Sequence, residues 1–139
     1  VMFFSSALIG VPFLEALAAD KRFEVVGVVT QEDKPVGRGL KLTPNVIKQT
    51  ALNLGLSSEE IQTPQKINPD LSLEGKNFFG RLESRKADFF VVIAYGKLMP
   101  QRLLDLPIFG AINVHGSLLP KYRGASPLQS VFLADEQQS

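Results

Sequence analysis

The sequence contains no cysteine and only one histidine among its 139 residues. Without cysteine it has no disulfide, no thiolate zinc site and no cysteine nucleophile. With a single histidine it has no two-histidine metal site of its own, so we expect no metal. The net charge of +1 creates no overall field that would attract nucleic acid or a membrane. Any contact with a nucleic acid must therefore come from a local basic patch.

Long apolar runs are also missing. The first twenty residues are apolar, but they lack a basic segment and Glu15 interrupts them, so neither a signal peptide nor a membrane span is expected. Hydrophobic residues make up 45% of the chain, which argues against disorder and suits one folded domain. We expect no membrane contact, a cytoplasmic location and a monomer in the intact protein.

Apolar runs alternate with segments of helical periodicity. Strands are expected at 1–4, 23–29, 61–62, 89–94 and 110–115, and helices at 12–19, 43–55, 76–86 and from Ser126 onward. Thr43 and Pro44 predict the N-cap and first position of the second helix, and Gly55 predicts its end. The run 89–94 is apolar throughout, which is typical of a central parallel strand. The pattern predicts an α/β fold with a mainly parallel sheet.

Nucleotide-binding glycine motifs are absent. A dinucleotide site would require G-x-G-x-x-G directly after the first strand. Residues 5–12 read SSALIGVP and contain one glycine, and no P-loop pattern occurs in the chain. Hydride chemistry and ATP chemistry of these kinds are therefore poorly supported.

Asn113 and His115 are stronger candidates for chemistry. They stand two residues apart in the predicted strand 110–115, so both side chains are expected on one face. They also lie at the carboxyl end of that strand, where open α/β sheets bind ligands. An amide donor beside an imidazole can stabilise an oxyanion and transfer a proton. The alternative is a hydrogen-bonded polar pair without a catalytic role.

Two loops are candidates for ligand binding. In residues 117–124, Pro120 restricts the backbone and Gly124 lets it bend, although a solvated basic turn has the same composition. In residues 94–100, Tyr95 and its apolar neighbours can wall a slot, and Gly96 would let a flat ligand approach the backbone. Ordinary core packing is the alternative for this second loop.

A second basic segment spans residues 31–48. Its charged residues are Lys34, Arg38, Lys41 and Lys48 against Glu32 and Asp33, a net charge of +2. Its proline and glycines favour a projecting loop over a helix. An arginine between two glycines on such a loop suits contact with a phosphate backbone, and a solvated loop is the alternative.

Three motifs together resemble a known family. They read VVTQEDKPVGRGLKLTP, AYGKLMPQRLLDLP and NVHGSLLPKYRGASPLQ, in this order. They are similar to motifs of the methionyl-tRNA formyltransferases, which belong to the folate-dependent formyltransferase family. The resemblance implies a Rossmann-like formyltransferase fold with helices on both faces of the sheet. It also implies transfer of a formyl group from 10-formyltetrahydrofolate to the amine of initiator methionyl-tRNA.

The resemblance further implies roles for individual residues. Asn113 and His115 match two of the family's three catalytic residues. The tetrahydrofolate-binding segment corresponds to Ser117, Leu118, Leu119 and Pro120, with the backbone near Tyr95 and Gly96 contributing to the pterin pocket. The loop with Lys34, Arg38 and Lys41 matches the insertion that contacts the acceptor end of the tRNA.

The sequence departs from the family pattern in three respects. SSALIGVP replaces the usual Gly-Thr-Pro type of turn, and neither the third catalytic residue, an aspartate, nor the carboxyl-terminal β-barrel domain lies within these residues. We expect residues 1–139 to be the amino-terminal portion of the catalytic domain, with little activity alone. A folate-dependent hydrolase, a small-amine formyltransferase and a truncated, non-catalytic binding fragment remain as alternatives.

Overall fold

The computed structural model describes residues 1–36, 41–43, 45–124, 130 and 133, apart from the side chains of 34–36 and 41–43. Within these residues, five parallel strands form one sheet in the order β5-β2-β1-β6-β7. The strands are β1 (Met2–Ser5), β2 (Gly27–Val29), β5 (Ile61–Gln62), β6 (Phe90–Ile93) and β7 (Ala111–Val114). The predicted parallel sheet is confirmed, with 89–94 forming an interior strand.

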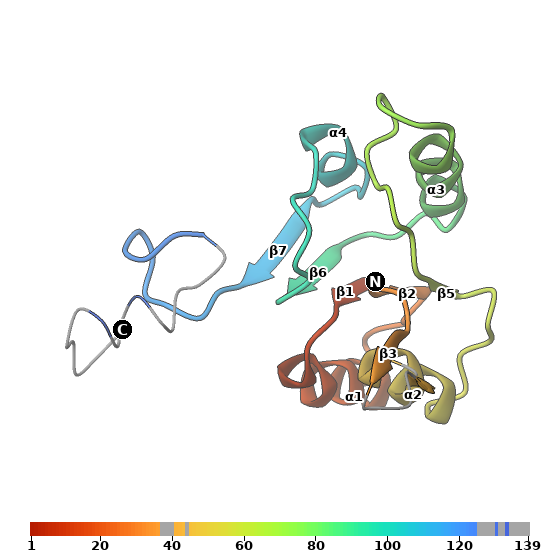
Figure 1. Cartoon of the computed structure of the whole chain (residues 1–139), viewed down its shortest axis with the longest axis horizontal. Helices are drawn as coiled ribbons and strands as arrows, with labels where there is room; N and C mark the ends of the chain where they lie inside the picture. The colour runs from red at the N-terminus through yellow and green to blue at the C-terminus, as the bar shows by residue number, and fades with distance from the viewer. Residues whose placement is uncertain (37–40, 44, 125–129, 131–132, 134–139) are drawn as a thin grey trace.

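Helices cover both faces of this sheet. They are α1 (Val11–Ala19), which follows the short 3-10 helix η1 (Leu8–Gly10), α2 (Val46–Asn53), α3 (Leu73–Ser84) and α4 (Gln101–Leu104). Figure 1 shows α1 and α2 on one side of the strands and α3 and α4 on the other. The α/β, Rossmann-like fold that the sequence predicts is therefore confirmed.

The first strand explains why the core divides into two layers. Phe3 and Phe4 are both fully buried, and successive residues of a strand point to opposite faces. Phe3 packs with Leu14 and Ile47 on the face of α1 and α2. Phe4 packs with Phe78 and other apolar residues on the face of α3. A strand buried on both faces needs the continuous apolar run that begins this sequence.

The strand order changes direction at β1. From β1 the chain moves to β2 and β5 on one side, and then returns to β6 and β7 on the other side. In open α/β sheets, ligands bind at the carboxyl ends of the strands beside such a reversal. The loops that follow β1 and β6 are therefore the first place to search for a site.

Some predicted boundaries were wrong. The strand predicted at 23–29 shortens to Gly27–Val29, because the Phe23 amide donates to the Asp20 carbonyl in a turn. The second helix begins after Asn45, whose side chain accepts a hydrogen bond from the Ile47 amide at 2.9 Å. Thr43 instead pairs with Lys34 in an antiparallel hairpin and is held in an extended conformation.

Other boundaries agree more closely with the sequence. Gly55 follows α2 with φ of +91°, which agrees with its predicted role as the end of that helix. The helix predicted from residue 76 begins at Leu73, because the Ser72 hydroxyl caps it by accepting from the Gly75 amide at 3.0 Å. The helix predicted from Ser126 lies outside the described residues.

Candidate functional site

Hydrogen bonds join the loops after β1, β2 and β6 at the strand reversal. The Tyr95 carbonyl accepts from the Ser6 hydroxyl at 2.9 Å and from the Gln31 amide nitrogen Nε2 at 3.0 Å. Ser6 follows β1, Gln31 lies beyond β2, and Tyr95 follows β6. One backbone oxygen therefore ties together three segments at the carboxyl edge of the sheet.

The backbone at Tyr95 and Gly96 has little freedom. Gly96 has φ of +80°, a conformation that favours glycine, and a Cβ atom there would lie 2.7 Å from Gln31 Nε2. The approach of a flat ligand to Gly96 stays a prediction. Here the approaching group is a side chain of the protein itself.

The Tyr95 side chain belongs to the core. It is 2% exposed, and its ring packs edge-on against Phe4 with centroids 5.5 Å apart. Burial raises the pKa of its phenol above the ordinary value, and the buried hydroxyl has no hydrogen-bond partner among the described residues. Met99 packs against the same cluster, whereas Leu98 is 95% exposed. The three side chains do not wall a common slot, and the core-packing alternative describes Tyr95 and Met99.

Asn45 fastens α2 to the same edge of the sheet. Besides capping the helix, its Oδ1 accepts from the Thr30 hydroxyl at 2.9 Å, and its Nδ2 donates to the Ser6 carbonyl at 3.4 Å. Its backbone amide donates to Asp33 at 3.1 Å. Asp33 also pairs with Lys48 at 2.6 Å. The pKa of Asp33 is lowered from its ordinary value, mainly by the hydrogen bond from the Lys48 ammonium and next by the one from the Asn45 amide.

Asn113 and His115 lie at the outer strand of the sheet. Asn113 pairs in register with Val92, and the next pair joins Ile93 to Val114. The residues after β6 and those after β7 therefore leave the sheet at the same edge. Asn113 is exposed and His115 is half-buried. Because β7 ends at Val114, the common orientation of their two side chains stays a prediction.

The predicted folate segment begins with a buried hydroxyl. Ser117 is 9% exposed, and its Oγ lies 3.0 Å from His115 Nδ1 and donates to the Lys121 carbonyl at 2.8 Å. Leu118 and Leu119 are 67% and 58% exposed, and Pro120 is also exposed. The segment thus presents apolar side chains outward while its serine hydroxyl faces inward, toward the histidine.

The basic segment is partly described. Lys34 lies in β3 (Lys34–Val36) and Lys41 in β4 (Lys41–Thr43), and these strands pair antiparallel. The projecting loop expected from the sequence therefore includes a hairpin. Arg38 lies outside the described residues.

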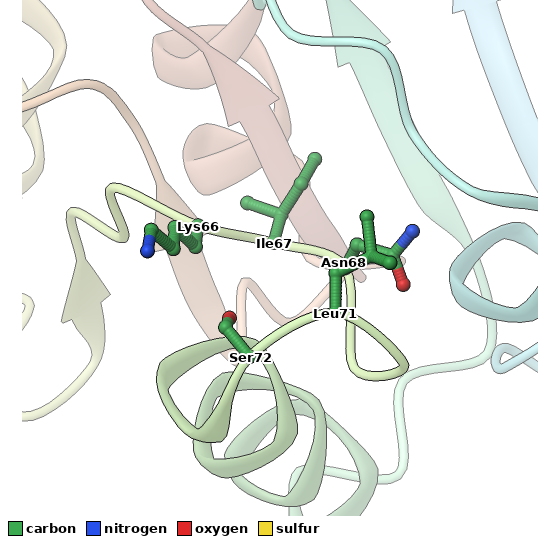
Figure 2. A pocket seen from close by; sticks show the side chains of 5 residues that line it. All are labelled: Lys66, Ile67, Asn68, Leu71 and Ser72. Carbon is green, nitrogen blue, oxygen red and sulfur yellow. The ribbon is translucent and has the colours of Figure 1, made fainter.

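A surface pocket of ≈ 350 Å³ lies elsewhere, beside the start of α3. It is lined by Lys66, Ile67, Asn68, Leu71 and Ser72 (Figure 2). None of these residues belongs to a sequence-predicted site, and they bring no acid–base pair together. The carboxyl edge of the sheet offers an amide and an imidazole, Asn113 and His115, so we place the candidate site there.

Two further structural facts concern metals and membranes. Among the described residues, no group of three or more His, Cys, Asp or Glu side chains is placed to hold a metal ion. In the same part of the chain, every helix is too short or too polar to cross a membrane.

Sequence reasoning missed the polar residues that organise this edge, namely Ser6, Gln31 and Asn45. Ser6 and Gln31 each come one or two residues after a buried apolar strand. That position is a usable signal, because polar side chains following parallel strands meet at one edge of a sheet. The backbone carbonyl of Tyr95, which accepts from both Ser6 and Gln31, cannot be recognised from the sequence.

The fold and this edge define a Rossmann-like α/β protein with a polar site at the carboxyl ends of its strands. Residues 1–139 match the formyl transferase family model, and the chain belongs to that family. It is 42% identical over 139 residues to methionyl-tRNA formyltransferase of Hydrogenobaculum sp., covering 100% of this chain and 42% of the relative. It is 46% identical over 136 residues to methionyl-tRNA formyltransferase of Deinococcus radiodurans, covering 98% and 40%. The chain thus spans about two fifths of the curated relatives it matches.

Solved structures share the fold. Phosphoribosylglycinamide formyltransferase from Bacillus halodurans aligns with a TM-score of 0.71 at 16% identity, covering 98% of this chain and 66% of that one. Glycinamide ribonucleotide transformylase 1 from Geobacillus kaustophilus aligns with a TM-score of 0.67 at 22% identity, covering 97% and 66%. At these identities the likeness concerns the fold alone.

Proposed function

We propose that this chain is the amino-terminal part of the catalytic domain of a methionyl-tRNA formyltransferase. The protein would transfer a formyl group from 10-formyltetrahydrofolate to the amine of initiator methionyl-tRNA. The observation that carries the proposal is 42% identity, over all 139 residues, to a protein of that name. The placement of Asn113 and His115 at the carboxyl edge of the sheet supports it.

Formyl transfer makes two demands that these side chains can meet. The acceptor amine attacks the formyl carbon and must lose a proton, and the formyl oxygen gains negative charge on the way. The bond between the formyl carbon and N10 of the folate then breaks, and that nitrogen leaves with a proton as tetrahydrofolate. In this proposal the Asn113 amide donates a hydrogen bond to that oxygen. The His115 imidazole shares in that stabilisation and assists the movement of the proton.

The folate donor is proposed to bind along Ser117, Leu118, Leu119 and Pro120 and beside the backbone of Tyr95 and Gly96. Leu118 and Leu119 are exposed and offer apolar contact to a flat ring. Gln31 Nε2 already lies beside Gly96, 2.7 Å from where a Cβ atom would be. The Tyr95 carbonyl already accepts two hydrogen bonds within the protein. We therefore assign the backbone there a shaping role.

The tRNA acceptor is proposed to contact Lys34, Arg38 and Lys41. Lys34 and Lys41 lie on two paired antiparallel strands, Lys34 opposite Thr43 and Lys41 opposite Val36. Positive side chains on such a projection suit the phosphate backbone of an RNA.

A direct assay distinguishes this function from its alternatives. The full-length gene product is supplied with 10-formyltetrahydrofolate and, in separate reactions, with water alone, a small primary amine or charged initiator tRNA. Formylation of the charged tRNA is the expected result. Faster turnover with water or the small amine would support the alternative enzymes, and folate binding without turnover would support a non-catalytic protein.

Replacing Asn113 by Ala tests the proposed oxyanion donor. We expect turnover to fall on the order of 10²–10³-fold, because a preorganised donor to a developing oxyanion contributes that much. Asn77→Ala, at an exposed position of α3, is the matched control and should leave turnover unchanged. Turnover near that of the unaltered protein would remove Asn113 from the mechanism.

Replacing Arg38 by Ala tests the proposed tRNA contact. We expect weaker tRNA binding and a slope of log K against log salt that is smaller by roughly 1, because one phosphate contact is lost. Arg22→Ala removes the same charge from an exposed ion pair with Asp20 and serves as the control. Unchanged tRNA affinity across the salt series would remove Arg38 from the interface.

A further inference from the structure

The contact between His115 and Ser117 determines which imidazole nitrogen is available. His115 Nδ1 lies 3.0 Å from Ser117 Oγ, and Ser117 is almost fully buried. Both residues follow β7, at the strand edge where the candidate site lies. The two ring nitrogens of a histidine are chemically distinct, and the hydrogen bond made by one decides the role of the other.

Proton counting around Ser117 Oγ gives the direction of this hydrogen bond. A serine hydroxyl has one proton to donate and two lone pairs that accept. The Lys121 carbonyl, 2.8 Å from Oγ, can only accept, and so can the Tyr122 carbonyl at 3.4 Å. The single proton is therefore engaged by a carbonyl, and a lone pair of Oγ faces the histidine. The imidazole must supply the proton for that contact, which makes Nδ1 the donor.

We propose that Ser117 is a positioning residue that holds neutral His115 in the Nδ1–H tautomer, so that Nε2 carries the free lone pair. When the imidazole gains or releases a proton, the exchange takes place at Nε2, because Nδ1 keeps its proton in both states. The backbone carbonyls at Lys121 and Tyr122 anchor the hydroxyl, so the turn after Pro120 sets the tautomer through one side chain.

For catalysis, the inference rests on the proposed function. The acceptor amine would deliver its proton to Nε2, and Ser117 itself would touch neither the amine nor the formyl group. The same serine falls within the proposed folate segment. Its hydroxyl is already engaged by three protein groups, so the apolar neighbours Leu118 and Leu119 are the side chains left to face the folate.

The tautomer can be measured directly, without any substrate. His115 is the only histidine among residues 1–139, and in the ¹⁵N-labelled full-length gene product its imidazole signals are the set that a His115→Gln variant loses. A long-range ¹H–¹⁵N spectrum is recorded at about pH 9, where an ordinary imidazole is neutral. We expect a protonated, pyrrole-like shift for Nδ1 and a pyridine-like shift for Nε2. Because an unconstrained neutral histidine favours the Nε2–H form, a protonated Nε2 in the unaltered protein would overturn the proposal.

Variants of Ser117 then test whether the hydroxyl is the cause. Ser117→Ala should shift the population toward Nε2–H, and Ser117→Thr, which retains the hydroxyl, should restore Nδ1–H. Ser84→Ala is the matched control, since that hydroxyl is exposed and donates to the Arg81 carbonyl in α3. A backbone amide spectrum checks that each variant is folded. A folded Ser117→Ala variant with unchanged Nδ1–H would overturn the role of Ser117, and should that variant not fold, the spectra of the unaltered protein and of Ser117→Thr decide.

A kinetic measurement separates this inference from the proposed function. In the full-length gene product, Ser117→Ala should lower turnover roughly 10- to 10²-fold, a part of the 10²–10⁴ that a positioned acid–base group contributes. Ser117→Thr should recover most of that loss. If the unaltered protein shows the Nδ1–H tautomer but formylates none of the acceptors, the proposed function fails and the tautomer assignment stands. If turnover is unaffected by Ser117→Ala while the tautomer changes, the catalytic meaning of the assignment is overturned.

Discussion

The centre of the sheet and its β7 edge are built in opposite ways. Every residue of β1 is buried, whereas all four residues of β7 are exposed. Figure 1 shows residues 115–124, which follow β7, running away from the other strands. The centre contains the hydrogen bonds that lock the loops together, and the edge carries Asn113 and His115. The comparison teaches that the buried centre of the sheet and the edge proposed for chemistry are neighbours built from different side chains.

The largest expected effect comes from a truncation in the centre. Phe4→Ala should lower the free energy of unfolding by about 3–5 kcal/mol, because Phe4 is fully buried against Phe90 and Tyr95. Ile112→Ala in β7 should cost about 1 kcal/mol or less, since Ile112 is 53% exposed. Denaturant unfolding followed by far-ultraviolet circular dichroism measures both variants. Equal losses would contradict the contrast between the two regions.

A smaller effect is expected at the junction of the loops. Gly96→Ala should destabilise the fold by about 1–2 kcal/mol, because φ is +80° there and an added Cβ would press on Gln31. Gly80→Ala is the matched control, since Gly80 lies inside α3 and an added Cβ would meet no atom of the described residues within 4 Å beyond its own helix backbone. That control should gain about 0.5–1 kcal/mol from helix propensity. A loss at Gly80, or none at Gly96, would contradict this account of the backbone.

The double variant Gly96→Ala with Gln31→Ala separates the two causes at this junction. Removing Gln31 relieves the close contact but leaves the left-handed backbone conformation in place. We expect partial recovery relative to the sum of the two single changes, measured as a coupling free energy. Strict additivity would leave backbone conformation as the sole cause.

The smallest effect is expected at the buried phenol. Tyr95→Phe should stabilise the fold by about 1 kcal/mol, because it removes a buried hydroxyl that has no hydrogen-bond partner in the part of the chain that the structure describes. It should also change the alkaline limb of the stability profile. Burial raises the pKa of Tyr95, so above the ordinary pKa of about 10 the unfolded chain releases a proton that the folded chain keeps, and stability falls as pH rises.

The free energy of unfolding, measured between about pH 9 and 11.5, checks the predicted fall in stability around the ordinary phenol pKa of about 10. Tyr95→Phe should lose less stability over this interval than the unaltered protein. Tyr122→Phe, which leaves Tyr95 in place, is the control and should retain the steeper fall. An identical alkaline limb for Tyr95→Phe and the unaltered protein would contradict the assignment to Tyr95.

Parts of the site could be predicted because they depend on local pattern. The apolar run before Tyr95 indicated an interior strand, and the end of the run 110–115 indicated where Asn113 and His115 emerge. Whether the two side chains share a face is harder to predict from the sequence. The strand β7 ends at Val114, so the alternation of side chains along a strand no longer applies to His115. Asn45 was missed as the helix cap, because Thr43-Pro44 matches the same local preference and only the hairpin excludes it.

By itself, the sequence determined the alternation of strand and helix, the two-faced burial of β1 and the residue types at the strand ends. These follow from hydrophobic periodicity, which acts over a few neighbouring residues. Tertiary structure alone decided that Ser6 would donate to the Tyr95 carbonyl 89 positions away, and that Gln31 would donate to the same oxygen from 64 positions away. The physical reason is that a hydrogen bond depends on distance and direction, and folding sets these by bringing backbone carbonyls to side chains that no local pattern connects.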